Sequence, residues 1–88
     1  MNAQKVNYNF NKRQCIRSLK QNGFINKSKR RKHFKFYPPD HIKEKIEAQK
    51  PQFIMVPNHR ELKVQHLIIK ELREMGGEEL VKSFLEKI

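Results

Sequence analysis

The sequence predicts an α+β domain in which helices cover one face of a three-stranded sheet. Three observations support this fold class. Residues 11–23 open with the Asn-x-x-Gln spacing of a helix capping box and close with Asn-Gly, which is typical of a helix end. Residues 33–37 alternate charged and aromatic side chains with the period-two pattern of a half-buried strand. Residues 64–88 hold two apolar helical stripes separated by Gly-Gly, and each stripe needs a surface to pack on.

The expected elements follow an α-β-β-β-α order with an extra C-terminal helix. Asn58 and Glu61 repeat the capping-box spacing, so we expect the second long helix to begin there and end at Gly76-Gly77. A polar insertion, residues 40–50, separates the second and third strands, and Asp40 can begin a short helix within it. We expect helices over 12–21, 58–75 and 78–88 and strands over 24–28, 33–37 and 53–56.

The strand at residues 33–37 sorts its side chains onto two faces. Successive side chains on a strand point to opposite sides of the sheet. Phe34 and Phe36 therefore share one face, which we expect the helices to cover. His33, Lys35 and Tyr37 share the other face, which we expect to stay open to solvent.

Length and cysteine content favour a single cytoplasmic domain. The chain has 88 residues, which is enough for one small core. No segment approaches the ~20 apolar residues that a membrane span needs, and the N-terminus lacks a signal-peptide pattern. The single cysteine excludes an internal disulfide, so we expect the reducing cytoplasm. No sequence feature predicts an oligomeric state.

The positive charge is concentrated in the N-terminal half. The net charge is +11, and residues 1–39 hold 11 Lys and Arg without any Asp or Glu, whereas residues 40–88 hold 9 basic and 9 acidic residues. Such asymmetry favours a polyanionic partner, of which nucleic acid is the first choice. An anionic membrane fits less well because no basic amphipathic helix is present. An acidic protein partner is compatible with nucleic-acid binding.

His33 is the candidate catalytic residue. A neutral imidazole can act as a general base near neutral pH. In RNA the 2′-hydroxyl is an internal nucleophile, so one base together with cations on the phosphate can cleave the strand without a metal. The alternative is that His33 is a solvated strand histidine without a role.

Several other residues are candidates for RNA contacts. Tyr37 can stack on an unpaired base or serve as a half-buried strand aromatic. His59, at the expected helix N-terminus, can contact a phosphate or simply join the helical turn. We expect no metal and no cofactor, because one cysteine and four scattered histidines fit no ligand spacing. The cations expected to hold phosphate are Lys29, Arg30, Arg31, Lys32 and Lys35.

The order of these segments resembles the HicA toxins of bacterial HicA/HicB toxin–antitoxin pairs. The resemblance rests on a helix ending in Gly23-Phe24, a basic turn, a strand opening with His33, and the sequence 56–59 (Val-Pro-Asn-His) leading into 64–75. It implies a fold like that of double-stranded-RNA-binding domains. It implies an endoribonuclease, an mRNA interferase that cleaves mRNA and blocks translation, with a single catalytic histidine that falls on His33. It also implies a HicB-type antitoxin that covers the active face.

The resemblance covers about residues 13–76 of the 88-residue chain, which we expect to form a single domain with three parts. We expect an N-terminal arm over 1–10, a HicA-like core over 11–76 and an added C-terminal helix over 78–88. The chain departs from the family in three places: Arg31-Lys32 replaces the usual Gly-Ser before the histidine, the insertion at 40–50 is long, and the last helix lies beyond the core. That helix can pack on the domain or contact a partner.

Two other functions compete with the nuclease hypothesis. A non-catalytic basic RNA-binding module, such as a ribosome-associated protein, needs the same cations but does not need His33. An interaction domain that holds an acidic protein needs neither RNA nor His33.

Overall fold

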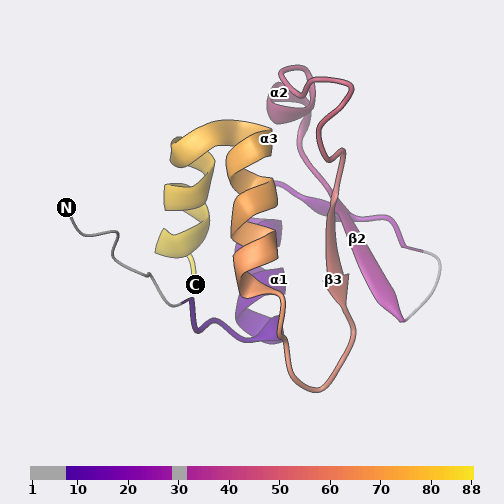
Figure 1. The fold of residues 1–88 in the computed structure, drawn as a ribbon, viewed down its shortest axis with the longest axis vertical. Coiled ribbons are helices and arrows are strands. Elements are labelled where there is room, and N and C mark those ends of the chain that lie inside the picture. Colours follow the sequence, from indigo (N-terminus) through magenta and orange to yellow (C-terminus); the bar gives the residue numbers. More distant parts are fainter. Residues whose placement is uncertain (1–7, 29–31) are drawn as a thin grey trace.

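A computed structural model of the chain describes residues 8–28 and 32–88. Helices lie on one side of a three-stranded antiparallel sheet, and the other side of the sheet is uncovered (Figure 1). The predicted α+β class is therefore confirmed. In chain order the elements are α1 (Lys12–Gln21), β1 (Ile25–Asn26), β2 (His33–Tyr37), α2 (Asp40–Lys43), β3 (Ile54–Pro57) and α3 (Gln65–Glu86).

Helix α1 begins and ends where the sequence predicts. The Asn11 carboxamide oxygen accepts a hydrogen bond from the Gln14 amide at 2.8 Å, and the Gln14 side chain accepts one from the Asn11 amide at 2.9 Å. This reciprocal pair satisfies two amides of the first turn. At the other end Gly23 adopts a φ of 90°, and the Phe24 amide returns to the Leu19 carbonyl at 2.9 Å. Both ends of α1 are thus fixed by local chemistry.

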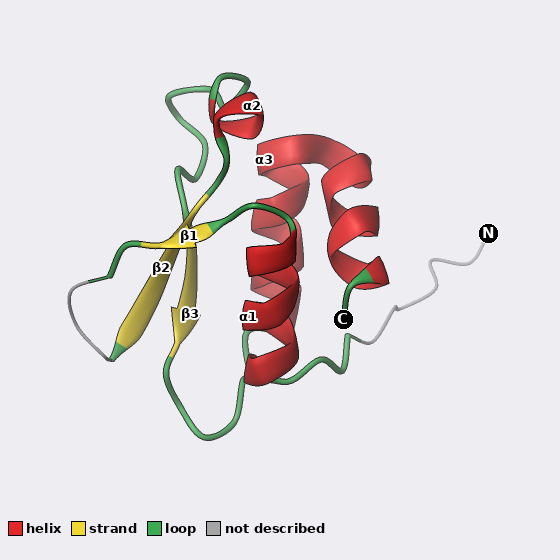
Figure 2. Cartoon of the chain, turned by 180° about the vertical axis from the view of Figure 1, so that it is seen from behind, coloured by secondary structure: helices red, strands yellow, loops and turns green. Residues whose placement is uncertain are grey.

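The sheet has the order β1-β2-β3, and its register sets the two faces. Phe34 lies opposite Val56, and Phe36 lies opposite Ile54. Directly opposite residues share a face, and this face is the one that α1 and α3 cover (Figure 2). Phe36, Ile54 and Val56 are fully buried, so the predicted inward side of β2 is confirmed.

Strand β1 is shorter than the predicted 24–28. Only Ile25 and Asn26 pair as strand residues, opposite Tyr37 and Phe36. Phe24 is buried in the core, and the Asn26 side chain turns to the Ser28 amide at 3.0 Å. These contacts at both ends of β1 limit its pairing with β2 to two residues.

Helix α3 begins at Gln65, so the predicted start at Asn58 is wrong. The Asn58 side chain accepts a hydrogen bond from Lys12 Nζ at 2.7 Å, and its amide donates to the Lys32 carbonyl at 2.9 Å. Asn58 therefore joins the sheet to α1 instead of capping a helix. The actual N-cap position is Val64, which makes no side-chain cap.

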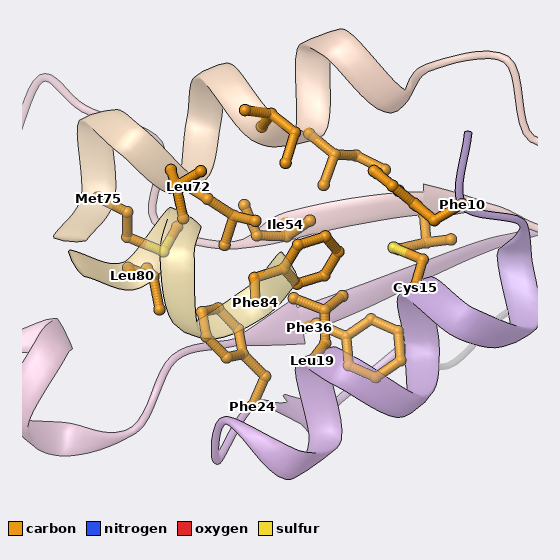
Figure 3. Close-up of a cluster of buried hydrophobic side chains, with 14 of the residues drawn as sticks. Phe10, Cys15, Leu19, Phe24, Phe36, Ile54, Leu72, Met75, Leu80 and Phe84 are labelled. Atoms are coloured by element: carbon orange, nitrogen blue, oxygen red, sulfur yellow. The ribbon is translucent and has the colours of Figure 1, made fainter. Parts of the chain in front are cut away.

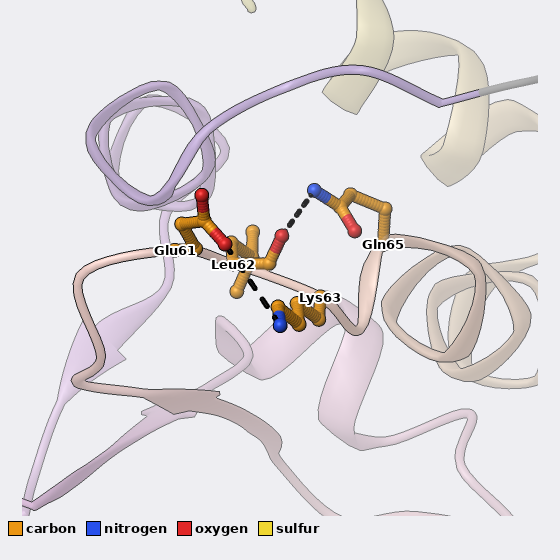
Figure 4. Close-up of polar contacts among 4 residues, drawn as sticks. All are labelled: Glu61, Leu62, Lys63 and Gln65. Atoms are coloured by element: carbon orange, nitrogen blue, oxygen red, sulfur yellow. Dashed lines mark hydrogen bonds and ion pairs between the residues drawn. The ribbon is translucent and has the colours of Figure 1, made fainter.

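The segment before α3 is held by its own contacts. The Gln65 carboxamide donates to the Leu62 carbonyl at 2.6 Å (Figure 4). It also donates to the Phe10 carbonyl at 3.1 Å. Leu62 is buried, while Glu61 and Lys63 on either side form an exposed ion pair at 3.8 Å. Glu61 thus faces Lys63 and forms no capping box with Asn58.

Gly77 divides α3 into two helical segments that run antiparallel (Figure 1). Its φ of 72° and ψ of −168° lie in a region that only glycine adopts readily. Arg73 and Glu78 form an ion pair across the bend. The predicted break at Gly76-Gly77 is confirmed.

The last helical segment is part of the core. Phe84 is fully buried, and its ring meets the edge of Phe10 at a centroid distance of 5.2 Å (Figure 3). Ser18 Oγ in α1 donates to the Phe84 carbonyl, and Ser83 Oγ donates to the Asn22 side chain. Of the two roles the sequence left open for this helix, packing on the domain is the one observed.

The end of the expected N-terminal arm, residues 1–10, packs on the core. Phe10 is a core residue at 4% exposure, and Tyr8 packs against the core from its partly buried position. Residues 1–7 lie outside the described part of the chain. Among the helices of residues 8–28 and 32–88, none combines the length and apolar character required to cross a membrane.

Candidate nucleic-acid interface

The uncovered side of the sheet carries the predicted outward residues of β2. His33 and Lys35 are exposed there, opposite Pro57 and Met55 of β3. Tyr37 lies opposite Ile25 of β1. We call this side the open face, and it consists of Ile25, Lys27, His33, Lys35, Tyr37, Phe53, Met55 and Pro57.

One end of the open face is an aromatic cluster with two cations above it. The Tyr37 ring lies 5.2 Å from the Phe53 ring, at an interplanar angle of 36°. Lys27 Nζ is 5.4 Å from the centre of the Tyr37 ring, and Lys35 Nζ is 5.4 Å from the centre of the Phe53 ring. Both distances suit a cation–π contact. Each ammonium group is thereby held beside a ring, while both lysines stay exposed.

Two exposed aliphatic side chains extend this cluster. Ile25 is 60% exposed and Met55 is 44% exposed. Base–aromatic stacking requires a flat apolar surface, and phosphate binding requires cations at its border. This end of the open face combines exposed apolar side chains with two cations.

The other end of the open face brings two histidines together. The rings of His33 and His59 lie with their centroids 6.2 Å apart and their planes at 88°. Both side chains are exposed. His59 does not lie at a helix N-terminus as predicted, because α3 begins only at Gln65. Its position follows from the β2–β3 register, which puts Pro57 directly opposite His33.

A short hydrogen-bond chain fixes the backbone around the histidine pair. The Asn58 amide donates to the carbonyl of Lys32, the residue before His33. Lys12, in the first turn of α1, donates its ammonium group to the Asn58 side chain. The residues that precede each histidine are therefore bonded to each other.

A shallow depression adjoins His59 on the loop that leads to α3. Arg60 and Lys63 bring positive charge to it, and Glu61 is already paired with Lys63. Its lining residues are Pro57, His59, Arg60, Glu61, Lys63 and Val64.

The predicted cations are only partly located by the structure. Lys32 and Lys35 are described and exposed. Lys29, Arg30 and Arg31 lie outside the described residues, so their expected phosphate contacts stay predictions.

The sequence reasoning missed three contributors, Phe53, Met55 and Lys12. The alternation of residues 53–57 carried a signal, because Phe53 and Met55 must face away from the side of Ile54 and Val56. Lys12 carried none, since its link to Asn58 depends on how α1 packs beside the sheet.

The two remaining histidines lie away from the open face. His41 is exposed in α2, and the His66 ring contacts Tyr8 at 5.1 Å. Within residues 8–28 and 32–88, no cluster of three or more His, Cys, Asp or Glu side chains has the arrangement of a metal site.

Comparisons of the chain with protein-family models, with curated proteins and with solved structures gave no match.

Proposed function

We propose that the chain is an endoribonuclease toxin of the HicA type, which cleaves mRNA in the cytoplasm without a metal. The observation that carries the proposal is the exposed His33 at one end of a basic open face whose other end offers rings for stacking. The sequence order of helix, basic turn, histidine strand and long helix supports the family assignment. We further propose that the domain is arranged like a double-stranded-RNA-binding domain.

RNA binding would use the two ends of the open face together. Lys35 and Lys27 can hold phosphates while bases stack on Tyr37 and Phe53. Lys32 would bring a further cation beside the histidine. Such a path would lay the backbone of the RNA across β2 toward His33.

Cleavage would begin with proton removal by His33. Its imidazole would take the proton of the 2′-hydroxyl next to the scissile phosphate, and the freed oxygen would attack phosphorus. Cations on the open face would stabilise the extra negative charge of the transition state. General base catalysis of this kind contributes roughly 10²–10⁴-fold to the rate.

The test is incubation of purified protein with mRNA in the presence of EDTA. Wild type should cleave, and His33→Ala should lose activity by roughly the 10²–10⁴-fold that a general base contributes, while keeping its fold. His41→Ala is the matched control, because it removes an exposed histidine elsewhere. Equal cleavage by wild type and His33→Ala, or cleavage by neither, removes the proposal.

A cellular assay tests the toxin role. Expression of the wild-type chain should arrest bacterial growth, and His33→Ala should restore it. The proposed partner is a HicB-type antitoxin that covers the open face. Co-expression of a small acidic protein from the neighbouring reading frame should then protect the cells, and its failure to bind would argue against the pairing.

The second candidate is a non-catalytic RNA-binding module. Arg31-Lys32 stands where HicA toxins usually have Gly-Ser, and a basic pair favours binding over close backbone approach. This candidate predicts RNA binding that weakens steeply with salt, no cleavage products, and equal affinity for wild type and His33→Ala.

A further inference from the structure

His59 is the group whose chemistry the single-histidine proposal does not use. It is far from His33 in sequence, yet the ring centroids lie 6.2 Å apart. Both imidazoles are exposed, so one substrate group can reach both. Two proton-transfer groups at this spacing suit a reaction that moves two protons at one phosphorus.

The backbone that carries the two rings is held by contacts on both sides. Pro57, two residues before His59, lies directly opposite His33 in the sheet. The Asn58 amide bonds the Lys32 carbonyl at 2.9 Å. Lys12 Nζ holds the Asn58 side chain at 2.7 Å, which ties the loop to α1 as well. The backbone next to each histidine is therefore held by the sheet and by α1, although His59 itself lies in a loop.

We propose that His59 is the general acid of the cleavage step, with His33 as the general base. This inference rests on the proposed function and adds a second catalytic residue to it. His33 takes the proton of the 2′-hydroxyl as the bond between the 2′-oxygen and phosphorus forms. The bond from phosphorus to the 5′-oxygen breaks, and that oxygen takes its proton from protonated His59.

The products of this step are a 2′,3′-cyclic phosphate and a 5′-hydroxyl end. His33 ends protonated and His59 neutral, so protons and charge balance without an outside oxidant or metal. Exchange with solvent returns both rings to their starting states. An in-line displacement places the attacking and leaving oxygens on opposite sides of phosphorus, so an acid and a base that act in the same step are two separate groups.

The surroundings of His59 suit an RNA chain that continues past the scissile phosphate. The depression beside it holds Arg60 together with the ion pair of Glu61 and Lys63, and Arg60 can take the next phosphate on the leaving side. Lys35 lies on the same face of β2 as His33 and is exposed, and the exposed Lys32 precedes His33 in the chain. The charge distribution thus lets the RNA backbone pass between the two rings.

The test compares two RNA oligonucleotides that span a cleavage site mapped with the wild-type protein. The first is ordinary RNA. In the second, the bridging 5′-oxygen at that site is replaced by sulfur, which leaves as a thiolate and needs no proton. The proteins are wild type, His33→Ala, His59→Ala and the control His41→Ala, whose exposed histidine lies in α2.

We expect His59→Ala to cleave ordinary RNA roughly 10²–10⁴-fold more slowly than wild type and to cleave the sulfur substrate at nearly the wild-type rate. His33→Ala should be slow on both substrates, and His41→Ala should match wild type on both. Equal loss by His59→Ala on the two substrates, or no loss on either, overturns the assignment while leaving the nuclease proposal intact. No cleavage by wild type overturns both.

The dependence of kcat/KM on pH gives a second readout. A base that must be neutral and an acid that must be protonated produce a bell-shaped profile. His59→Ala should keep the rise on the acidic side and lose the fall on the alkaline side. A bell that survives in His59→Ala would show that another group donates the proton.

Discussion

Replacing Phe84 by alanine should strongly destabilise the domain. Phe84 is fully buried, and its ring packs against the edge of Phe10 at 5.2 Å. Removing a buried phenylalanine side chain lowers the free energy of unfolding by about 3–5 kcal/mol, because the protein buries less apolar surface and a cavity remains. A domain of this length has a free energy of unfolding of roughly 4–13 kcal/mol. Phe84→Ala should therefore remove between a quarter and all of the stability.

The assay is urea unfolding followed by far-UV circular dichroism, with Leu85→Ala as the matched control. Leu85 is the next residue on the same helix and is 38% exposed, so its replacement removes much less buried surface. We expect a change of about 1 kcal/mol or less for Leu85→Ala. A Phe84→Ala variant as stable as Leu85→Ala would refute the claim that the last helical segment completes the core.

Three further predictions concern single buried or strained positions. Burial raises the pKa of the Cys15 thiol to about 12, so alkylation at pH 8 should require urea. The unfolded thiol ionises near its ordinary pKa of 9.0, so the free energy of unfolding of wild type should fall between pH 9 and 12 more than that of Cys15→Ala. Equal falls in the two proteins would contradict this prediction. Burial, and then the nearby Glu74 charge, raise the pKa of the Glu71 carboxyl, so its ionised form opposes folding. Glu71→Gln should therefore raise Tm at pH 7, and the gain should vanish below about pH 4, where the carboxyl is protonated in both states. A lower Tm for Glu71→Gln at pH 7 would show that the ionised carboxyl stabilises the fold. Gly77→Ala should lower the free energy of unfolding in urea by about 1–3 kcal/mol. Nothing lies within 4 Å of the added methyl group, so the cost comes only from backbone strain at a φ of +72°. An unchanged urea midpoint would exclude that strain.

The parts of the fold that the sequence predicted are those governed by local chemistry. The capping pair Asn11 and Gln14 fixes the start of α1 through contacts three residues apart. The alternation in β2 placed Phe36 inward and His33 outward, because strand geometry leaves no other arrangement. Gly77 ends the first segment of α3 because glycine adopts its backbone conformation without the strain that other residues would have.

The parts that failed are those in which a tertiary contact competes with a local one. Asn58 and Glu61 have capping-box spacing, but Lys12 and Lys63 are their partners in the folded domain. Leu67 is apolar yet 51% exposed, because the buried side of α3 runs through Ile68, Leu72 and Met75.

The sequence predicted which face of β2 three candidate residues occupy, but it did not predict how they lie relative to other strands and loops. His33, Lys35 and Tyr37 follow from the period of one strand, and the structure puts them on the open face. The proximity of His33 to His59 depends on the register between β2 and β3, which is a long-range pairing. No spacing within the sequence could have given a ring separation of 6.2 Å.

The packing of Phe84 against Phe10, and of Ser83 against Asn22, has a consequence for synthesis of the chain. Translation proceeds from the N-terminus, so α1 and the sheet leave the ribosome before the segment that closes over them. Until Phe84 emerges, the core lacks one of its fully buried side chains. The RNA cleavage proposed for the open face would therefore begin only after the core is complete.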